Sequence, residues 1–132
     1  LRKCGVAPNR LAFLARGAAE CAAQQEYSHV SLVSVLTDPE TFPTISGLEY
    51  GRLPAVLLDV AEFERERTAI RELLDTTLAG LSAEGLVTTT AEETPWILDW
   101  AGRQDPARTV APDDVSIDTA VVGDPIGFLH VA

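Results

Sequence analysis

The clearest periodic pattern in the chain is an apolar stripe that recurs every three or four residues between positions 60 and 83. Glu, Arg and Asp make up the opposite face, so the pattern predicts an amphipathic helix about 35 Å long at 1.5 Å per residue. Asp59, with Glu62 three residues later, predicts the N-cap, and Gly85 is predicted to follow the last turn. The stripe consists of Phe63, Ile70, Leu73, Leu74, Leu78 and Leu81.

Two apolar or β-branched segments flank this helix and predict strands. Residues 55–58 are apolar at every position, which is typical of a strand buried on both faces, and residues 86–90 are rich in Val and Thr. A strand, helix and strand in this order predict a parallel crossover unit, in which ligands bind beyond the carboxyl ends of the strands. Asp59 would lie at that position, but the segment has no glycine-rich phosphate loop, so a capping role is favoured.

Weaker patterns predict the other elements. Asn9 and an Ala-rich apolar stripe predict a helix over about 10–25, and Thr94-Pro95 predicts the start of a short helix over 95–101. Alternation predicts a strand over 28–36 and a C-terminal hairpin formed by 115–121 and 126–131, with a turn at Gly123-Asp124-Pro125. The remaining segments, 38–53 and 102–112, are predicted to be loops.

These elements predict an α+β fold in which two main helices pack on a sheet of four or five largely antiparallel strands. A three-layer α/β arrangement is the alternative. The length of 132 residues favours a single domain over 1–132. The start at Leu1 and the absence of methionine are typical of a processed chain or of a fragment of a longer one.

Composition restricts the classes of partner. Hydrophobic residues make up 46% and charged residues 23%, as in globular proteins, and no apolar run approaches the roughly 18 residues of a membrane span. The net charge of −10 argues against a nucleic-acid partner and favours a basic protein partner. Nearly all the basic residues are arginine, which is typical of a GC-rich bacterial or halophilic archaeal coding sequence.

The two cysteines give no metal or redox motif. Cys4 and Cys21 are not in CxxC spacing, so two reduced thiols and a cytoplasmic location are predicted, with a Cys4–Cys21 disulfide as the alternative.

No motif predicts a catalytic residue, a cofactor or a metal site. Glu26 and His29 have the Glu-x-x-His spacing of carboxylate metal sites, but such a site requires a second copy of the motif. The acidic pairs Glu92-Glu93 and Asp113-Asp114 lie in predicted turns, which are commonly solvated.

The favoured function is therefore a small, acidic, non-enzymatic module of a bacterial protein that binds another protein, such as an adaptor, an immunity protein, an antitoxin or a regulatory domain. Its candidate interaction surface comprises Trp96 and Trp100, which are four residues apart, together with Phe42 and Tyr50 in the predicted loop 38–53. The alternative for the two tryptophans is that they close the core under the long helix.

Two other functions remain open. One is a homo-oligomeric structural subunit, such as a virion or tail component. The other is an enzyme whose site is assembled in space around His29 or His130.

Overall fold

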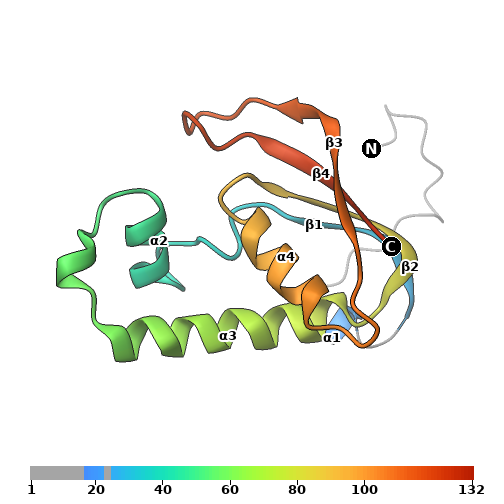
Figure 1. Ribbon diagram of the computed structural model, residues 1–132, viewed down its shortest axis with the longest axis horizontal. Helices are drawn as coiled ribbons and strands as arrows, with labels where there is room; N and C mark the ends of the chain where they lie inside the picture. The colour runs from blue at the N-terminus through green and yellow to red at the C-terminus, as the bar shows by residue number, and fades with distance from the viewer. Residues whose placement is uncertain (1–16, 23–24) are drawn as a thin grey trace.

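The computed structural model describes residues 17–22 and 25–132, and its fold is α+β, as predicted (Figure 1). An open, mixed sheet of four strands is accompanied by four α-helices and one 3-10 turn in this part of the chain. The elements in chain order are α1 (Ala18–Ala22), β1 (Tyr27–Leu32), α2 (Pro43–Glu49), η3 (Ala55–Leu57), α3 (Val60–Leu78), β2 (Leu81–Thr90), α4 (Thr94–Gly102), β3 (Val110–Ile117) and β4 (Ile126–Val131).

The sheet has the strand order β1-β2-β4-β3. β1 pairs with β2 in parallel, whereas the β2–β4 and β3–β4 pairs are antiparallel, so the prediction of a largely antiparallel sheet is confirmed. Val87 of β2 stands between Val30 of β1 and Leu129 of β4. Because side chains alternate along a strand, this row faces one side of the sheet.

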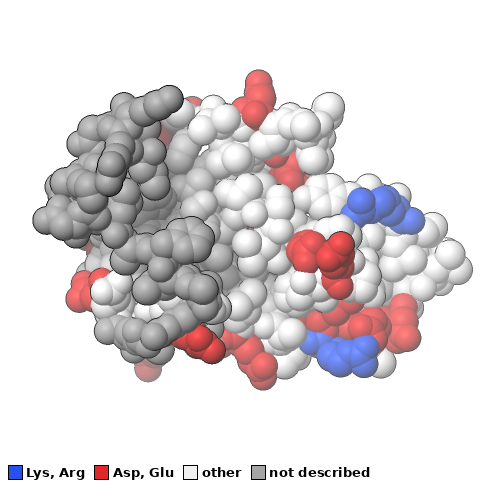
Figure 2. All heavy atoms as spheres, turned by 180° about the vertical axis from the view of Figure 1, so that it is seen from behind, with Lys and Arg blue, Asp and Glu red and all other residues white. Residues whose placement is uncertain are grey.

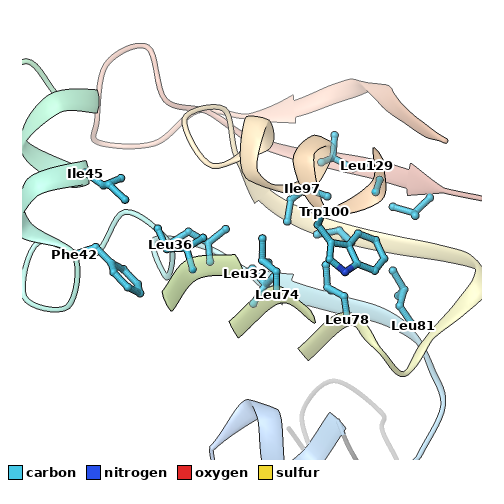
Figure 3. Close-up of a cluster of buried hydrophobic side chains, with 14 residues drawn as sticks. Leu32, Leu36, Phe42, Ile45, Leu74, Leu78, Leu81, Ile97, Trp100 and Leu129 are labelled. Carbon is cyan, nitrogen blue, oxygen red and sulfur yellow. The ribbon is translucent and has the colours of Figure 1, made fainter. Parts of the chain in front are cut away.

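The core lies between that side of the sheet and the helices α3 and α4 (Figures 1 and 3). Each fully buried aliphatic or aromatic side chain there contributes about 1.5–3 kcal/mol relative to exposure. Trp100 of α4 is 2% exposed, so the alternative in which it closes the core is correct for this residue. The same buried cluster includes Leu32, Ile70, Leu74, Leu78, Leu81, Val87, Ile97, Leu129 and Val131.

The long helix begins where the sequence predicts but ends earlier. The Asp59 side chain accepts a hydrogen bond from the Glu62 amide at 3.2 Å, which confirms the N-cap. α3 ends at Leu78, and the predicted role of Gly85 is wrong because this residue is buried inside β2. Leu81, the last residue of the predicted stripe, is buried as the first residue of β2 and not as part of the helix. The stripe therefore extends beyond the end of α3.

The prediction of a buried strand over 55–58 is also wrong. This segment forms the turn η3, where Val56 is 91% and Leu57 68% exposed. The parallel partner of β2 is β1 instead, so the crossover between the parallel strands runs through α2, η3 and α3. Four consecutive apolar residues form a buried strand only when a neighbouring strand is free to pair with them. Here β1 already pairs with β2 on that side of the sheet.

The predicted loop 38–53 contains the helix α2. Its first turn is capped from a distance, because the buried Glu66 of α3 accepts hydrogen bonds from the amides of Thr44 at 3.0 Å and Ile45 at 2.9 Å. Phe42 and Ile45 anchor the segment in the core. Because this cap comes from a residue some twenty positions later in the chain, the sequence at the start of α2 contains no N-cap motif. This explains why a loop was predicted over 38–53.

The remaining predicted elements are present where the structure describes them, but several of their bounds differ. The strand predicted over 28–36 is β1, which ends at Leu32, and the strand predicted over 86–90 is β2, which begins at Leu81. α4 and the C-terminal hairpin form, although β3 begins within the predicted loop 102–112 and ends at Ile117. Of the helix predicted over 10–25, only α1 lies among the described residues. Cys4 lies outside them, so its predicted state is not addressed. Within the described part, no helix has the length and apolar character needed to cross a membrane.

Candidate functional site

A cleft opens beyond the carboxyl ends of the parallel strands β1 and β2, which is where α/β units commonly bind ligands. We call it the Glu49 cleft; its volume is about 570 Å³. It is lined by Ser34, Thr37 and Pro39 after β1, by Ser46, Glu49, Tyr50 and Arg52 at the end of α2, by Glu92 after β2, and by Val121 and Val122 at the hairpin tip. A hollow of about 530 Å³ lies between α1 and β2, and Glu26 is the only charged residue among its described lining residues.

The buried carboxylate of Glu93 organises the base of the cleft. Glu93 is 0% exposed, and its oxygens accept hydrogen bonds from the amides of Leu36 at 2.6 Å and Ser34 at 3.1 Å and from the Thr89 hydroxyl at 3.1 Å. These donors offset the cost of burying the charge. They also hold the turn after β1, in which Ser34 has a φ of 56°.

A second buried carboxylate, Asp124, joins the hairpin tip to the rest of the cleft. Its Oδ2 accepts a hydrogen bond from the Tyr50 hydroxyl at 2.8 Å, and its Oδ1 accepts one from the Glu92 amide at 2.8 Å. Burial, above all, raises the pKa of Tyr50 above its ordinary value. The side chain of Asp124 therefore fixes the end of α2 against the start of α4.

Glu49 is the carboxyl group whose environment is most unusual. Its Oε1 accepts a hydrogen bond from the Trp96 indole at 3.1 Å, whereas its Oε2 is buried and has no partner among the described residues. Burial raises the pKa of Glu49 to about 7; the bond from Trp96 opposes this shift, and the negative charges of Glu92, Glu93 and Asp124 add to it. Glu49 thus gains and loses a proton near neutral pH.

Among the described residues, Arg52 is the only basic one that lines the cleft. Its Nη2 donates a hydrogen bond to the Ser46 hydroxyl at 2.6 Å, and its guanidinium carbon lies 5.4 Å from the centre of the Tyr50 ring. The described contacts include no ion pair between Arg52 and a carboxylate. Among the described residues, the carboxyl groups that line the cleft therefore take part in no ion pair.

The structure brings together two of the four predicted interaction residues. Tyr50 lines the Glu49 cleft, and Trp96 stands behind Glu49 and is connected to the cleft through their hydrogen bond. Phe42 and Trp100 are 6% and 2% exposed and belong to the core. In this structure only Tyr50 and Trp96, both half-buried, combine aromatic surface with a polar contact at the cleft.

The two histidines lie on the opposite face of the sheet from the core. Both pair in register with Leu86 of β2, so their backbones are two strand spacings, about 9.5 Å, apart. His29 Nε2 lies 2.8 Å from the Thr88 hydroxyl, and His130 Nε2 lies 3.1 Å from Asp113. Each histidine thus has its own partner. Among residues 17–22 and 25–132, no group of three or more His, Cys, Asp or Glu side chains could hold a metal ion.

Reasoning from sequence alone missed most of the cleft. The pair Glu92-Glu93 was expected to be a solvated acidic turn, but Glu93 is fully buried. Its position directly after the second parallel strand was an available signal. Glu49, by contrast, comes from the segment predicted to be a loop, and Asp124 comes from a turn.

Comparisons of the chain with protein-family models, with curated proteins and with solved structures find no match.

Proposed function

We propose that this chain is a non-enzymatic protein-binding module and that the Glu49 cleft is the surface that receives its partner. The observation that carries the proposal is the composition of the cleft, which combines carboxyl groups that are in no ion pair with the described residues, a half-buried tyrosine and an exposed apolar rim. Interfaces commonly combine an aromatic or apolar centre with polar groups that fix the register of the partner. The partner that fits is a basic segment of another protein.

The charge of the described part of the chain supports a basic partner. All 20 Asp and Glu residues lie there, whereas four of the ten basic residues lie outside it, which leaves six. Figure 2 shows one face of the molecule. Among the described residues on this face, acidic side chains are spread widely, whereas basic side chains lie toward one end. This excess of carboxylates would speed the association with a basic protein and would repel nucleic acid.

The basic residues inside the described part are already engaged. Carboxylates form ion pairs with Arg65, Arg67, Arg71 and Arg103. Arg108 donates hydrogen bonds to backbone carbonyls at the start of β2. No described arginine other than Arg52 reaches into the cleft. Counter-charge for Glu49 and Glu92 is therefore most readily supplied by another molecule.

The rim of the cleft supplies apolar contact area. Val122 is 99% and Val121 49% exposed at the tip of the β3–β4 hairpin. Covering a fully exposed valine contributes about 1.5 kcal/mol or more to association. This contribution adds to the electrostatic one and would make the hairpin tip the apolar half of the interface.

Selection of binding peptides from a displayed random library tests the proposal. We expect the selected peptides to bind the wild-type protein and to lose at least tenfold in affinity for Val122→Ser and for Glu92→Gln. Val115→Ser and Glu72→Gln are the matched controls, because both residues are exposed and lie outside the cleft. Peptides that bind all five proteins equally well, or a library that yields no binder, would overturn the proposal.

An exposed apolar patch elsewhere favours a second candidate, a homo-oligomeric structural subunit. Val56, Leu57 and Val60 are 91%, 68% and 65% exposed around η3 and the start of α3. Sedimentation velocity over increasing concentration would then show association that Leu57→Ser and Val60→Ser abolish. A monomer at the highest attainable concentration would exclude this candidate.

The proposal also assigns the protein to the bacterial cytoplasm. This assignment rests on the predominance of arginine among the basic residues and on the prediction that the two cysteines are reduced thiols.

A further inference from the structure

We propose that the Glu49 cleft recognises one protonated side chain of the partner, an arginine or a lysine, which binds between Glu49 and Glu92. This inference rests on the proposed function and makes it more specific, because it names the chemical group that the cleft selects. It follows from the state of each carboxyl group in and behind the cleft.

Two of the four carboxyl groups are buried and already have a donor on each oxygen. Glu93 accepts hydrogen bonds from backbone and side-chain donors on both oxygens, and Asp124 accepts one from the Tyr50 hydroxyl and one from the Glu92 amide. Both side chains are buried. They add negative potential to the cleft from behind without contacting a ligand.

The other two carboxyl groups line the cleft and have oxygens without a donor. The Glu92 side chain takes part in no hydrogen bond or ion pair with the described residues. Oε2 of Glu49 is buried and likewise has no donor among them. A buried carboxyl oxygen without a donor raises the free energy of the folded protein. A hydrogen bond from a cationic donor to such an oxygen therefore contributes more binding free energy than the same bond at the surface.

Binding must move the Glu49 carboxyl group. Because Oε2 is buried in the free protein, a ligand reaches it only when the carboxyl group turns toward the cleft. Oε1, which Trp96 holds at 3.1 Å, must then shift as well. The indole proton of Trp96 is therefore a direct reporter of an occupied cleft.

The rim suits the rest of a basic side chain. Lys and Arg carry apolar methylene stems below their charged ends, and the exposed Val122 offers apolar surface for such a stem. Arg52 lies on the Tyr50 ring and hydrogen-bonds Ser46, so its charge is not in an ion pair with either carboxyl group. The partner's cation therefore does not need to displace an existing ion pair.

Nuclear magnetic resonance titration with three matched peptides tests the inference. The probes are acetylated, amidated pentapeptides of alanine with a central arginine, lysine or citrulline; citrulline keeps the shape of arginine without its charge. We expect saturable shifts of the Trp96 indole resonance with the arginine or the lysine peptide, and at least tenfold weaker binding of the citrulline peptide.

Variants of the protein complete the test. Glu49→Gln and Glu92→Gln should each weaken binding of the charged peptide at least tenfold, while Glu72→Gln on the solvated side of α3 should leave it unchanged. Equal binding of the citrulline peptide, unchanged binding by both cleft variants, or no Trp96 shift with either charged peptide at 10 mM or so would overturn the inference. If library peptides bind the cleft but carry no basic residue, the inference fails together with the proposed basic character of the partner, whereas the Glu49 cleft remains the protein-binding surface.

Discussion

The indole N–H of Trp96 donates a hydrogen bond to Oε1 of Glu49 at 3.1 Å and so joins α4 to the last residue of α2. The two residues are 47 positions apart, and each comes from an element whose main contacts are elsewhere in the core. The bond satisfies one oxygen of the carboxyl group and leaves the other buried without a donor. Most of the chemistry that we infer for the cleft follows from this asymmetry.

Glu49→Gln should stabilise the protein in a pH-dependent way. The pKa of Glu49 is raised from 4.5 to about 7 in the folded state, so the folded protein binds this proton more tightly than the unfolded chain does. The contribution of Glu49 to the free energy of unfolding therefore falls as the pH rises from about 4.5 to about 7. Glutamine cannot ionise and removes this loss.

Urea unfolding of the wild type and Glu49→Gln at pH 5 and pH 8 measures this effect. We expect similar free energies of unfolding at pH 5 and a more stable variant at pH 8. Glu72→Gln, at an exposed residue outside the cleft, is the control that should not change the pH dependence. A constant difference between Glu49→Gln and the wild type across this range would contradict the raised pKa.

Glu93→Gln should lower the free energy of unfolding by about 2–3 kcal/mol. The amide group would turn an N–H donor toward backbone amides that now donate to the carboxylate, which leaves buried donors unpaired. Glu92→Gln is the neighbouring control, and we expect a change within about 0.5 kcal/mol. Chemical denaturation of both variants at pH 7 checks the prediction; similar effects of the two substitutions would contradict it.

Asp99→Asn should weaken the contact between α3 and α4. Asp99 accepts hydrogen bonds from Arg71 Nε at 3.0 Å, Arg71 Nη2 at 2.7 Å and Arg103 Nε at 3.0 Å. The bonds from Arg71, followed by those from Arg103, lower the pKa of Asp99. The contact is partly solvated, so we expect a loss of about 0.5–1 kcal/mol at pH 7.

The pH dependence of that loss identifies its cause. A carboxylate with a lowered pKa stabilises the fold above its unfolded pKa, and this stabilisation disappears as the pH falls through the folded pKa. The difference between the wild type and Asp99→Asn should therefore shrink between pH 5 and pH 3, and also in 1 M salt. A difference that persists under both conditions would indicate packing rather than charge.

Gly80→Ala should destabilise the junction between α3 and β2 by about 1–3 kcal/mol. A Cβ atom at residue 80 would lie 2.8 Å from the Gln25 carbonyl oxygen and 3.0 Å from that of Ala22, and backbone atoms cannot easily move away. Gly102→Ala is the matched control, because nothing lies within 4 Å of its Cβ position. Thermal unfolding should show a lower midpoint for the first variant only, and equal midpoints would contradict the close packing.

Sequence patterns predicted the elements whose cause is local. The N-cap Asp59 bonds to a residue three positions away, α4 begins at Thr94-Pro95, and the C-terminal hairpin follows from alternation. In each case the residues that determine the structure are neighbours in the chain.

The errors share a different physical origin. Residues 55–57 of the apolar run are exposed because β1 already occupies the position beside β2, and α2 depends on a cap that Glu66 supplies from α3. The Glu49 cleft combines residues that are dozens of positions apart, so no motif marks it in the sequence. Which acidic residues are buried is decided by these distant contacts and not by local composition.

The pKa of the Glu49 carboxyl group, measured by carbon-13 NMR in the free protein and with the charged peptide bound, tests the central claim most directly. We predict a value of about 7 in the free protein, because burial and the surrounding carboxylates disfavour ionisation. The bound cation should lower this value by at least one unit, which corresponds to a tenfold linkage between binding and loss of the proton. An ordinary pKa near 4.5 in the free protein, or a value that the saturating peptide leaves unchanged, would contradict the account.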